Sequence, residues 1–371
     1  MVLSLFKRKQ EKEFKKIIGG KAYYHLQVKK VIRETDDAIT IIFDNPNDEI
    51  TYKPGQYLTL ILEIKGEKFR RSYSLSSSPD YDKEIAVTVK KIGGGKVSHY
   101  LNHNLKNGDW IEIMEPLGNF TTDFNPEISR TLLMFAGGSG ITPLISIIKS
   151  ALILEPNSKV ILVYQNRHES SMIFNELIQK LILEFNDRFE VHHYLSQPSS
   201  EWGGKKGRLT ESEIKKILED KRFSLEGLHV FSCGPEGMMS NVHSSLDKIK
   251  FPLNRRYKES FTTSSSSLDL KKDKTLNTEN INSTVTIILD NEEHVIQVPK
   301  NDYILETALD ADLNLPFSCQ SGLCTSCRGR LISGEVNMED PDGITEEEIA
   351  DGYILTCISQ PVSEKIKIEI G

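Results

Sequence analysis

The sequence predicts a multidomain chain of three folded modules: an antiparallel β-barrel, a doubly wound parallel α/β sheet and an α+β module of β-grasp type. Three observations lead to this division. Short β-rich runs follow one another from Tyr23, strands and helices alternate from Thr131, and a cysteine-rich loop stands near the C-terminal end. The first pattern is typical of small barrels and the second of parallel sheets covered by helices. The expected divisions are a tail at 1–22, modules at 23–126, 127–257 and 284–371, and a flexible linker at 258–283.

Composition narrows the class of protein. With 371 residues the chain is longer than one ordinary domain, and its 38% hydrophobic and 27% charged content is that of a globular protein. A net charge of −7 gives no reason to expect nucleic-acid binding, and no apolar run is long enough for a membrane span. Four of the five cysteines gather near the C-terminal end, so no disulfide framework is expected. This usage favours a cytoplasmic protein.

The first module is predicted from six β-rich runs punctuated by turn residues. Turn signals such as Lys53-Pro54-Gly55 and Asn107-Gly108-Asp109 separate the runs, and apolar alternation is clear around Ile39. The expected strands are Tyr24–Glu34, Ala38–Asp44, Tyr57–Ile64, Phe69–Leu75, Ile85–Ile92 and Trp110–Glu115.

Two stretches of this module suggest more than a scaffold. In Arg71-Ser72-Tyr73-Ser74, the arginine can neutralise a phosphate, the tyrosine can lie on an aromatic ring, and the serine can donate to a ring nitrogen. Polar residues leaving a strand can equally be an edge. The second stretch, Gly93–Leu101, is a glycine-rich loop that runs into a helical pattern, and helix N-terminal amides bind pyrophosphate. Its alternative is a flexible connection.

The middle module is predicted from nearly continuous apolar strands that alternate with helical patterns, as in a parallel sheet covered on both faces. The expected strands are Leu132–Ala136, Lys159–Tyr164, Phe189–Leu195 and Leu228–Ser232. The expected helices are Pro143–Leu154, Met172–Phe185, Glu211–Leu218 and Met238–Ile249.

Glycines and a cysteine follow two of these strands. In Gly137–Pro143, glycines allow close approach of the backbone to a pyrophosphate, and Pro143 suits a first helical turn. A tight turn without a ligand is the alternative. Cys233 ends the last strand, at the sheet edge where open α/β sheets bind ligands. A lone cysteine there can also be a small buried hydrophobe.

Open α/β sheets of this kind bind dinucleotides, and for a nicotinamide dinucleotide the groups after the second strand would decide between NADPH and NADH. Arg167 and Ser171 can bind a 2′-phosphate, and Arg208 can assist them. No acidic residue closes that strand to take both ribose hydroxyls, which is the usual NADH solution. We therefore favour NADPH, with NADH possible and a merely solvated Arg167 as the alternative.

The cysteine loop has the spacing C-x4-C-x2-C, followed later by a fourth cysteine. This is the plant-type pattern for a 2Fe–2S cluster. Small residues and Gly322 allow the loop to wrap tightly, with its amides directed at the sulfurs. A structural zinc site is the alternative, but it usually has two matched C-x2-C pairs. The expected ligands are Cys319, Cys324, Cys327 and Cys357.

Around this loop, strands and one clear helix complete the last module. The helix, Tyr303–Asp312, has apolar residues at helical spacing, and Thr345 is expected to cap an acidic helix. The expected strands are Thr284–Leu289, His294–Val298, Gly329–Ile332, Glu335–Met338 and Lys365–Ile370.

Taken together, the motifs resemble the ferredoxin–NADP reductase superfamily with a C-terminal plant-type ferredoxin. R-x-Y-S and G-x-x-S are paired flavin motifs there. The resemblance implies that Arg71 holds flavin phosphate, Tyr73 packs on the isoalloxazine and Ser74 lies near N5. A pyrophosphate site implies FAD rather than FMN, and its expected residues are Gly95, Lys96, Val97 and Ser98.

The same resemblance assigns the middle module to NAD(P)H. The segment A-G-G-x-G-I-T-P carries Gly137, Gly138, Gly140 and Thr142, and Thr142 is implied to lie at the flavin–nicotinamide contact. C-G-P-x-x-M-M carries Cys233, Gly234 and Pro235, with Cys233 facing nicotinamide as an orienting group. The implied catalytic residues are Ser74, Thr142 and Cys233.

The order of the modules implies a relay from NAD(P)H through FAD and 2Fe–2S to an oxygenase or hydroxylase component. The arrangement resembles the reductase subunits of bacterial phenylacetyl-CoA epoxidases, which act in phenylacetate catabolism. Reductases of Rieske oxygenases, steroid hydroxylases and hybrid-cluster proteins share the plan. Gln320 departs from photosynthetic ferredoxins, where a basic residue often follows the first cysteine. A simple NAD(P)H oxidase and a redox-sensing binding module are also compatible with parts of the pattern.

Overall fold

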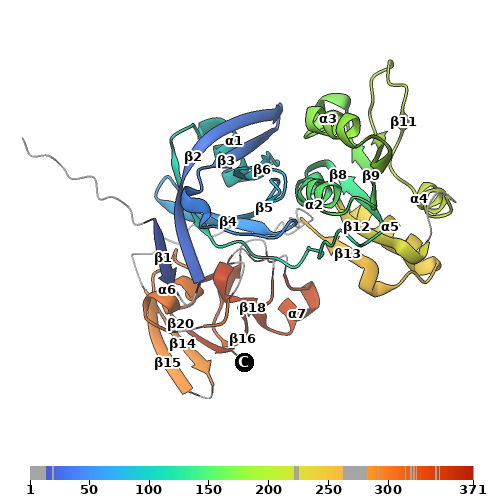
Figure 1. Cartoon of the computed structure of the whole chain (residues 1–371). Coiled ribbons are helices and arrows are strands. Elements are labelled where there is room, and N and C mark those ends of the chain that lie inside the picture. Colours follow the sequence, from blue (N-terminus) through green and yellow to red (C-terminus); the bar gives the residue numbers. More distant parts are fainter. Residues whose placement is uncertain are drawn as a thin grey trace, which may run out of the picture.

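The computed structural model describes residues 14–18, 21–220, 225–261, 282–290, 292–313, 315–317, 320, 322, 324–338, 341 and 343–370. It contains three main sheets, one in each predicted module, and a two-stranded ribbon (Figure 1). Most of the predicted tail and linker, and the predicted ligand Cys319, lie outside the described residues.

The first sheet is the predicted antiparallel barrel. Its strands pair in the order β5-β4-β7-β2-β3-β6, with β1 beside β2, and a bridge between Leu75 and Val87 brings β5 towards β6. Alternate residues such as Leu58 and Leu60 are fully buried in its core. The strands are β1 (Lys15–Ile18), β2 (Lys21–Thr35), β3 (Ala38–Phe43), β4 (Tyr57–Ile64), β5 (Glu67–Ser74), β6 (Ile85–Lys90) and β7 (Trp110–Met114). Helix α1 (Lys96–Asn104) lies between β6 and β7 in the chain.

Strand β1 and the start of β2 lie within the segment expected to be a tail. Lys15–Ile18 pairs antiparallel with the first residues of β2. Its lysines are tied to the barrel, because Lys15 pairs with Glu49 and Lys16 with Glu112. Four residues with two lysines carry too little apolar alternation to show a strand in the sequence. Here the pairing with β2 determines the structure.

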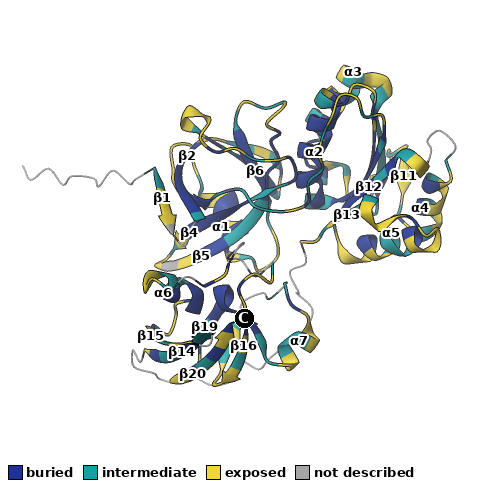
Figure 2. Cartoon of the chain, turned by 60° about the horizontal axis from the view of Figure 1, so that its bottom comes forward, coloured by how far each residue is buried: buried dark blue, intermediate teal, exposed yellow. Residues whose placement is uncertain are grey.

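The second sheet is entirely parallel, in the order β11-β10-β9-β8-β12-β13, as predicted for the doubly wound module. Helices α2 and α3 pack in one buried cluster and α4 and α5 in another, so both faces are covered. Helix α2 is buried along most of its length (Figure 2). Strands are β8 (Thr131–Gly137), β9 (Lys159–Asn166), β10 (Phe189–Leu195), β11 (Lys205–Lys206), β12 (Leu228–Cys233) and β13 (Arg256–Glu259). Helices are α2 (Ile141–Leu154), α3 (Asn175–Phe185), α4 (Glu211–Leu218) and α5 (Glu236–Lys248).

Two edge strands of this sheet are absent from the sequence prediction. Strand β11 has two lysines, and β13 has the charged sequence Arg-Tyr-Lys-Glu, so neither shows an apolar pattern. Strand β13 pairs with β12 and extends the sheet beyond residue 257, where the linker was expected to begin. No helix in the described parts of the chain has the length and apolar character needed to cross a membrane.

The barrel and the parallel sheet meet along helix α2. The Lys149 ammonium donates to the Ser76 carbonyl at 2.7 Å and also pairs with Asp82. Ser146 donates to the Ser77 carbonyl at 2.5 Å, and Ser78 and Ser150 share a hydrogen bond of 2.7 Å. Burial lowers the pKa of Lys149, and Asp82 opposes that shift. This seam joins the two modules through buried polar groups whose partners come from both sides.

The third sheet is a mixed sheet of five strands in the order β15-β14-β20-β16-β18, packed against α6, as expected for a β-grasp module. Only β14 and β20 pair in parallel among its described strands. Thr345 caps α7 with a reciprocal box to Glu348. The elements are β14 (Ser283–Leu289), β15 (Glu292–Val298), α6 (Ile304–Asp310), β16 (Arg328–Ser333), β17 (Val336–Met338), α7 (Glu346–Ala350), β18 (Tyr353–Leu355), β19 (Ser359–Pro361) and β20 (Lys365–Ile370). The three-residue strands β18 and β19 were not predicted.

Candidate functional site

Strand β5 places the predicted flavin residues at the end of the barrel that meets the parallel sheet. Arg71 and Tyr73 share one face of the strand, since side chains alternate along it. Ser74, the last residue of β5, is 3% exposed. Along β5 a guanidinium, an aromatic ring and a hydroxyl follow one another, at Arg71, Tyr73 and Ser74. In the same order, these groups can bind the phosphate, the ring system and the reactive nitrogen of a flavin. The donor set fits a flavin nucleotide.

The glycine-rich loop leads into α1 as predicted. Gly95 is the N-cap residue of α1. Because glycine has no side chain, it offers no side-chain acceptor to the first backbone amides of this helix. A Cβ on Gly95 would lie 2.5 Å from Ile92 and 2.7 Å from the Ser98 hydroxyl. Ser98 is buried, and its hydroxyl accepts from the Ile92 amide and donates to the Gly95 carbonyl, each at 3.2 Å. Ser98 therefore shapes the loop, and its direct contact with a pyrophosphate stays a prediction, as does that of Lys96 and Val97.

The two loops at the carboxyl ends of β8 and β12 pack directly against each other. A Cβ on Gly140 would lie 2.1 Å from the Cys233 carbonyl oxygen, and one on Gly137 would lie 2.4 Å from Pro235. Gly138, by contrast, has φ +54° and its nearest outside atom is 3.9 Å from a Cβ. The sequence pattern assigned all three glycines to a ligand. In the structure Gly137 and Gly140 allow the two loops to pack against each other, and Gly138 leaves space beside the backbone; the ligand contacts of all three glycines stay predictions.

We expect Gly140→Ala to destabilise this junction. The added methyl group has no room beside Cys233, and overpacking of this kind typically costs about 1–3 kcal/mol. Thermal unfolding should occur roughly 2–8 °C lower, and the KM for the nucleotide should rise. Gly237→Ala is the matched control, because no atom lies within 4 Å of the methyl group that it would add. Equal melting temperatures for the two variants would contradict the packing argument.

Ser74, Cys233 and Glu259 meet where the barrel faces the parallel sheet. The Ser74 hydroxyl donates to the Glu259 carboxylate at 3.2 Å, and Glu259 is the register partner of Cys233 across β12 and β13. Burial raises the pKa of Glu259 to about 7, although the hydrogen bond from Ser74 acts to lower it. Burial, and then the charge of Glu259, raise the pKa of Cys233. A protonated thiol suits an orienting group better than a nucleophile.

Glu259 is a site residue that the motifs of the sequence do not reveal. Its neighbours Glu259-Ser260-Phe261 look like the end of a domain, and β13 has no apolar pattern. Only the pairing of β13 with β12 brings this carboxylate to Ser74. Thr142 lies in the first turn of α2, and its contact with a flavin or nicotinamide stays a prediction. It is 2% exposed and its hydroxyl donates to the Ser139 carbonyl at 3.0 Å.

The residues expected to select NADPH follow β9. Arg167 and Arg208 are both exposed, and the Leu209 amide beside Arg208 donates to the Gln165 side chain on β9 at 2.6 Å. Both arginines thus flank the carboxyl end of one strand. Ser171 is less available, because its hydroxyl donates to the His168 carbonyl at 2.8 Å and accepts from the His168 amide. A phosphate contact from Ser171 would have to replace the bond to His168.

The described cysteines of the predicted cluster loop lie in a tightly folded region. The Cys327 carbonyl accepts from the Thr356 amide at 3.1 Å and from its hydroxyl at 3.0 Å, which ties the loop to Cys357. A Cβ on Gly343 would lie 2.9 Å from the backbone of Cys324, and Gly322 has φ +76°. Cys327 and Cys357 are buried and Cys324 is half-buried. Thiols from a close-wrapped loop and a later segment fit a 2Fe–2S cluster.

Three family models match successive parts of the chain. The oxidoreductase FAD-binding domain matches residues 24–122, and the oxidoreductase NAD-binding domain matches residues 134–244. The 2Fe-2S iron-sulfur cluster binding domain matches residues 287–362. These three matches agree with the predicted cofactors FAD, pyridine nucleotide and 2Fe–2S.

Individual proteins match along nearly the whole chain. The ferredoxin reductase component of 3-ketosteroid-9-alpha-monooxygenase from Rhodococcus rhodochrous is 35% identical and covers 93% of this chain and 96% of its own. A component of the 1,2-phenylacetyl-CoA epoxidase from Escherichia coli (strain K12) is 31% identical and covers 94% and 97%. The structure of phthalate dioxygenase reductase has a TM-score of 0.67 at 23% identity and covers 94% of this chain and 98% of its own, which supports the fold.

Proposed function

The chain belongs to the family of modular reductases that join FAD-binding, NAD-binding and 2Fe–2S domains, and we propose that it delivers electrons from NADPH to the oxygenase component of a phenylacetyl-CoA epoxidase-type system. It is an oxidoreductase of the electron-transfer kind that serves multicomponent oxygenases. The observation that carries this proposal is that both oxygenase-system proteins match through all three modules, over 93% and 94% of this chain. The predicted boundaries 23–126, 127–257 and 284–371 stay part of the proposal, with the first module extended back to β1 and the second extended forward to Glu259 of β13.

The residues at the junction of the first two modules have separate roles in the electron relay. When bound, FAD supplies the change from hydride transfer to single-electron transfer, and the cluster supplies a one-electron carrier. Arg71 holds a flavin phosphate, Tyr73 orients the ring system, and Cys233 packs beside nicotinamide. Ser74 and Glu259 hold a proton at the Ser74 hydroxyl, within 3.2 Å of the carboxylate. Tight contact between the two modules excludes water from the site.

The two exposed arginines beside β9 support NADPH as the donor. Arg167 and Arg208 flank the strand end, and Glu169, the nearest acidic side chain in the sequence after β9, accepts hydrogen bonds from the amide and hydroxyl of Ser199. A carboxylate engaged in this way is not oriented for ribose hydroxyls, whereas guanidinium groups suit a phosphate.

We expect the double variant Arg167→Ala, Arg208→Ala to raise the KM for NADPH by about 10- to 100-fold, because two charge-assisted contacts are removed. The KM for NADH should change little, since that nucleotide has no 2′-phosphate. Steady-state reduction of ferricyanide with each nucleotide measures both values. Lys215→Ala is a suitable control, because this exposed lysine on α4 forms its ion pair with Glu219, four residues away on the same helix. An equal effect on NADH would contradict the assignment.

The acceptor is tested by reconstitution with purified oxygenase components. Product formation from phenylacetyl-CoA, driven by NADPH through this chain, is the expected result. A second candidate is the oxygenase of a ketosteroid system, which the 35% identity to the Rhodococcus rhodochrous reductase favours. Tight coupling of NADPH consumption to steroid hydroxylation, with uncoupled oxidation in the epoxidase assay, would decide for that second candidate.

A further inference from the structure

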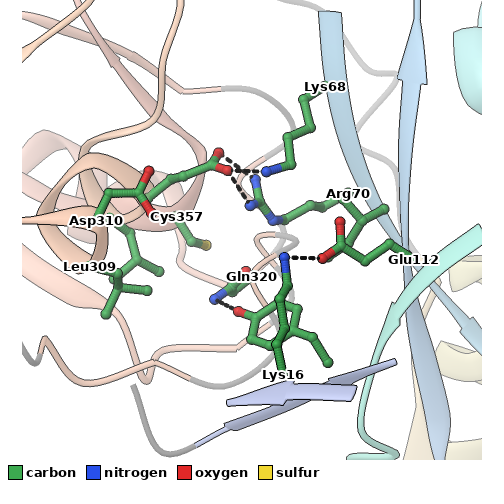
Figure 3. Close-up of a pocket in the computed structure, with 12 residues that line it drawn as sticks. Lys16, Lys68, Arg70, Glu112, Leu309, Asp310, Gln320 and Cys357 are labelled. Atoms are coloured by element: carbon green, nitrogen blue, oxygen red, sulfur yellow. Dashed lines mark hydrogen bonds and ion pairs between the residues drawn. The ribbon is translucent and has the colours of Figure 1, made fainter. Parts of the chain in front are cut away.

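Residues of helix α6 and Gln320 of the cluster loop lie opposite residues of strands β2, β4 and β5 of the barrel (Figure 3). A cavity of about 90 Å³ separates them and is lined from both sides. Tyr23 and Ile61 of the barrel face Leu305 and Cys357 of the third module across it. Tyr23, Ile61 and Met114 also belong to the same buried apolar cluster as the core of the third module. The two modules thus share one packed interface.

One carboxylate of α6 is held between two cations of β5. Glu306 accepts from Arg70 through both oxygens, at 2.7 and 2.8 Å, and pairs with Lys68. Figure 3 labels the two cations, Arg70 and Lys68. The Arg70 side chain is 8% exposed and that of Glu306 is 23% exposed, so this is not a solvated surface pair. Burial works to raise the pKa of Glu306, but Arg70 and Lys68 outweigh it and lower the pKa to about 2. The pair is ionised throughout the neutral range.

The cluster loop makes its own contact with the barrel. Gln320, which directly follows the predicted ligand Cys319, donates its side-chain amide to the Tyr23 hydroxyl at 2.7 Å. Gln320 is 4% exposed and has φ +51°, and burial raises the pKa of Tyr23 to about 12. The departure from photosynthetic ferredoxins therefore has a structural reason, because a lysine or arginine here would place a charge against Tyr23 and beside Arg70.

Strand β5 connects this interface with the flavin site. Arg70 and Arg71 are neighbours on the strand, so their side chains leave opposite faces. Arg70 contacts Glu306, while Arg71 belongs to the predicted flavin motif. Cys357, a predicted cluster ligand, lines the same cavity as Lys68 and Arg70 of β5. One strand thus separates the two redox sites and contacts the modules that hold them.

We propose that this surface is the electron-entry face of the third module, and that Arg70, Glu306 and Gln320 are positioning residues for electron transfer between flavin and cluster. The inference rests on the proposed relay function. An interface that served only to attach the module would not need to present the cluster loop and Cys357 to the flavin-bearing strand. Gln320 and Glu306 fix two separate points of the module, which defines its orientation as well as its distance.

The test uses the full-length holoprotein and its Glu306→Gln variant. Anaerobic stopped-flow with NADPH follows flavin bleaching and cluster bleaching separately. The variant should reduce its flavin at the normal rate and its cluster about 10- to 100-fold more slowly, because small misplacements slow reactions by such factors. Small-angle X-ray scattering should show a larger radius of gyration. Glu293→Gln is the matched control, since Glu293 pairs with Lys367 at 2.7 Å on the exposed side of the same module.

Further variants distinguish an effect on the docking of the third module from damage to the cluster itself. Arg70→Gln changes only the barrel and should slow cluster reduction like Glu306→Gln, with unchanged iron content. The exchange Arg70→Glu, Glu306→Arg should recover only part of the lost rate, because Lys68 would still face position 306 and repel the new arginine. Normal cluster reduction in both single variants would overturn the proposal, as would equal slowing of the flavin and cluster steps. If the cluster of the unmodified protein stays oxidised, the relay itself fails, which is a different result.

Discussion

Replacing Cys324 by alanine is expected to abolish electron delivery to the oxygenase while leaving flavin reduction by NADPH intact. A plant-type cluster needs four thiolates, and Cys324 supplies one of the three that come from the loop. Cys324 is half-buried, whereas Cys327 and Cys357 are buried in the module core, so its loss removes a ligand with the least loss of packing. The variant should lack the visible and EPR signals of the cluster.

The control for this variant is another cysteine in the same chain. Cys233→Ser should keep a full complement of iron and sulfide, because Cys233 lies in the parallel sheet and is far from the cluster loop in the chain. Its defect should appear in flavin reduction instead. Oxygenase turnover by a Cys324→Ala protein without a cluster would show that electrons leave directly from the flavin, as a simple flavin reductase predicts.

Glu259→Gln is expected to slow turnover by about 100-fold, a typical loss for a positioned acid or base. Glu259 accepts a hydrogen bond from Ser74 and can take a proton that arrives at that hydroxyl. Only its ionised form can accept one. Because the pKa of Glu259 is raised to about 7, the group is protonated at pH 6 and ionised at pH 8. Turnover of the unmodified protein should therefore rise with pH through about 7 and then level off.

The glutamine variant should lose this pH dependence along with the rate. The folding stability of the Glu259→Gln variant provides the control. A carboxyl group with a raised pKa lowers the stability of the folded state as pH rises from about 4.5 to about 7, since ionisation is easier in the unfolded chain. Glu259→Gln should then be at least as stable as the unmodified protein at pH 8. A stable variant that retains the inflection near pH 7 would assign the titration to another group.

The fold could be predicted where a strand or helix has clear borders in the sequence. Strand β4 and strand β10 have the predicted bounds, because Tyr57–Ile64 and Phe189–Leu195 combine β-rich composition with clear borders. Helix α4 also has its predicted bounds, which a Thr210 capping box fixes. Short, charged edge strands such as β1 and β13 could not be predicted, since their stability comes from the neighbouring strand.

The residues of the candidate site also fall into two groups, those that a local sequence pattern reveals and those that only long-range contacts reveal. Motif residues such as Arg71 and Cys327 could be singled out because spacing within one segment carries their chemistry. Glu259 and Glu306 could not, since each gains its role from a partner far away in the chain, Ser74 and Arg70 respectively. In the sequence Gln320 stands out only as a departure from a pattern, and its partner Tyr23 lies near the other end of the chain. Long-range pairing of polar groups is not encoded in any local periodicity.

The seam along α2 determines where this chain can be divided into working fragments. A cut between the barrel and the parallel sheet would leave Lys149, which is 2% exposed, without Asp82 and the Ser76 carbonyl. The same cut would divide the apolar cluster in which Ala38 and Phe120 pack with helix α2, so neither half is a sound starting point for a stable product. A cut after Phe261 keeps that seam whole and uncovers mainly Tyr23, Ile61 and Met114. Fragment design and the exchange of redox modules between reductases should therefore keep the border along α2 intact and cut the chain after Phe261.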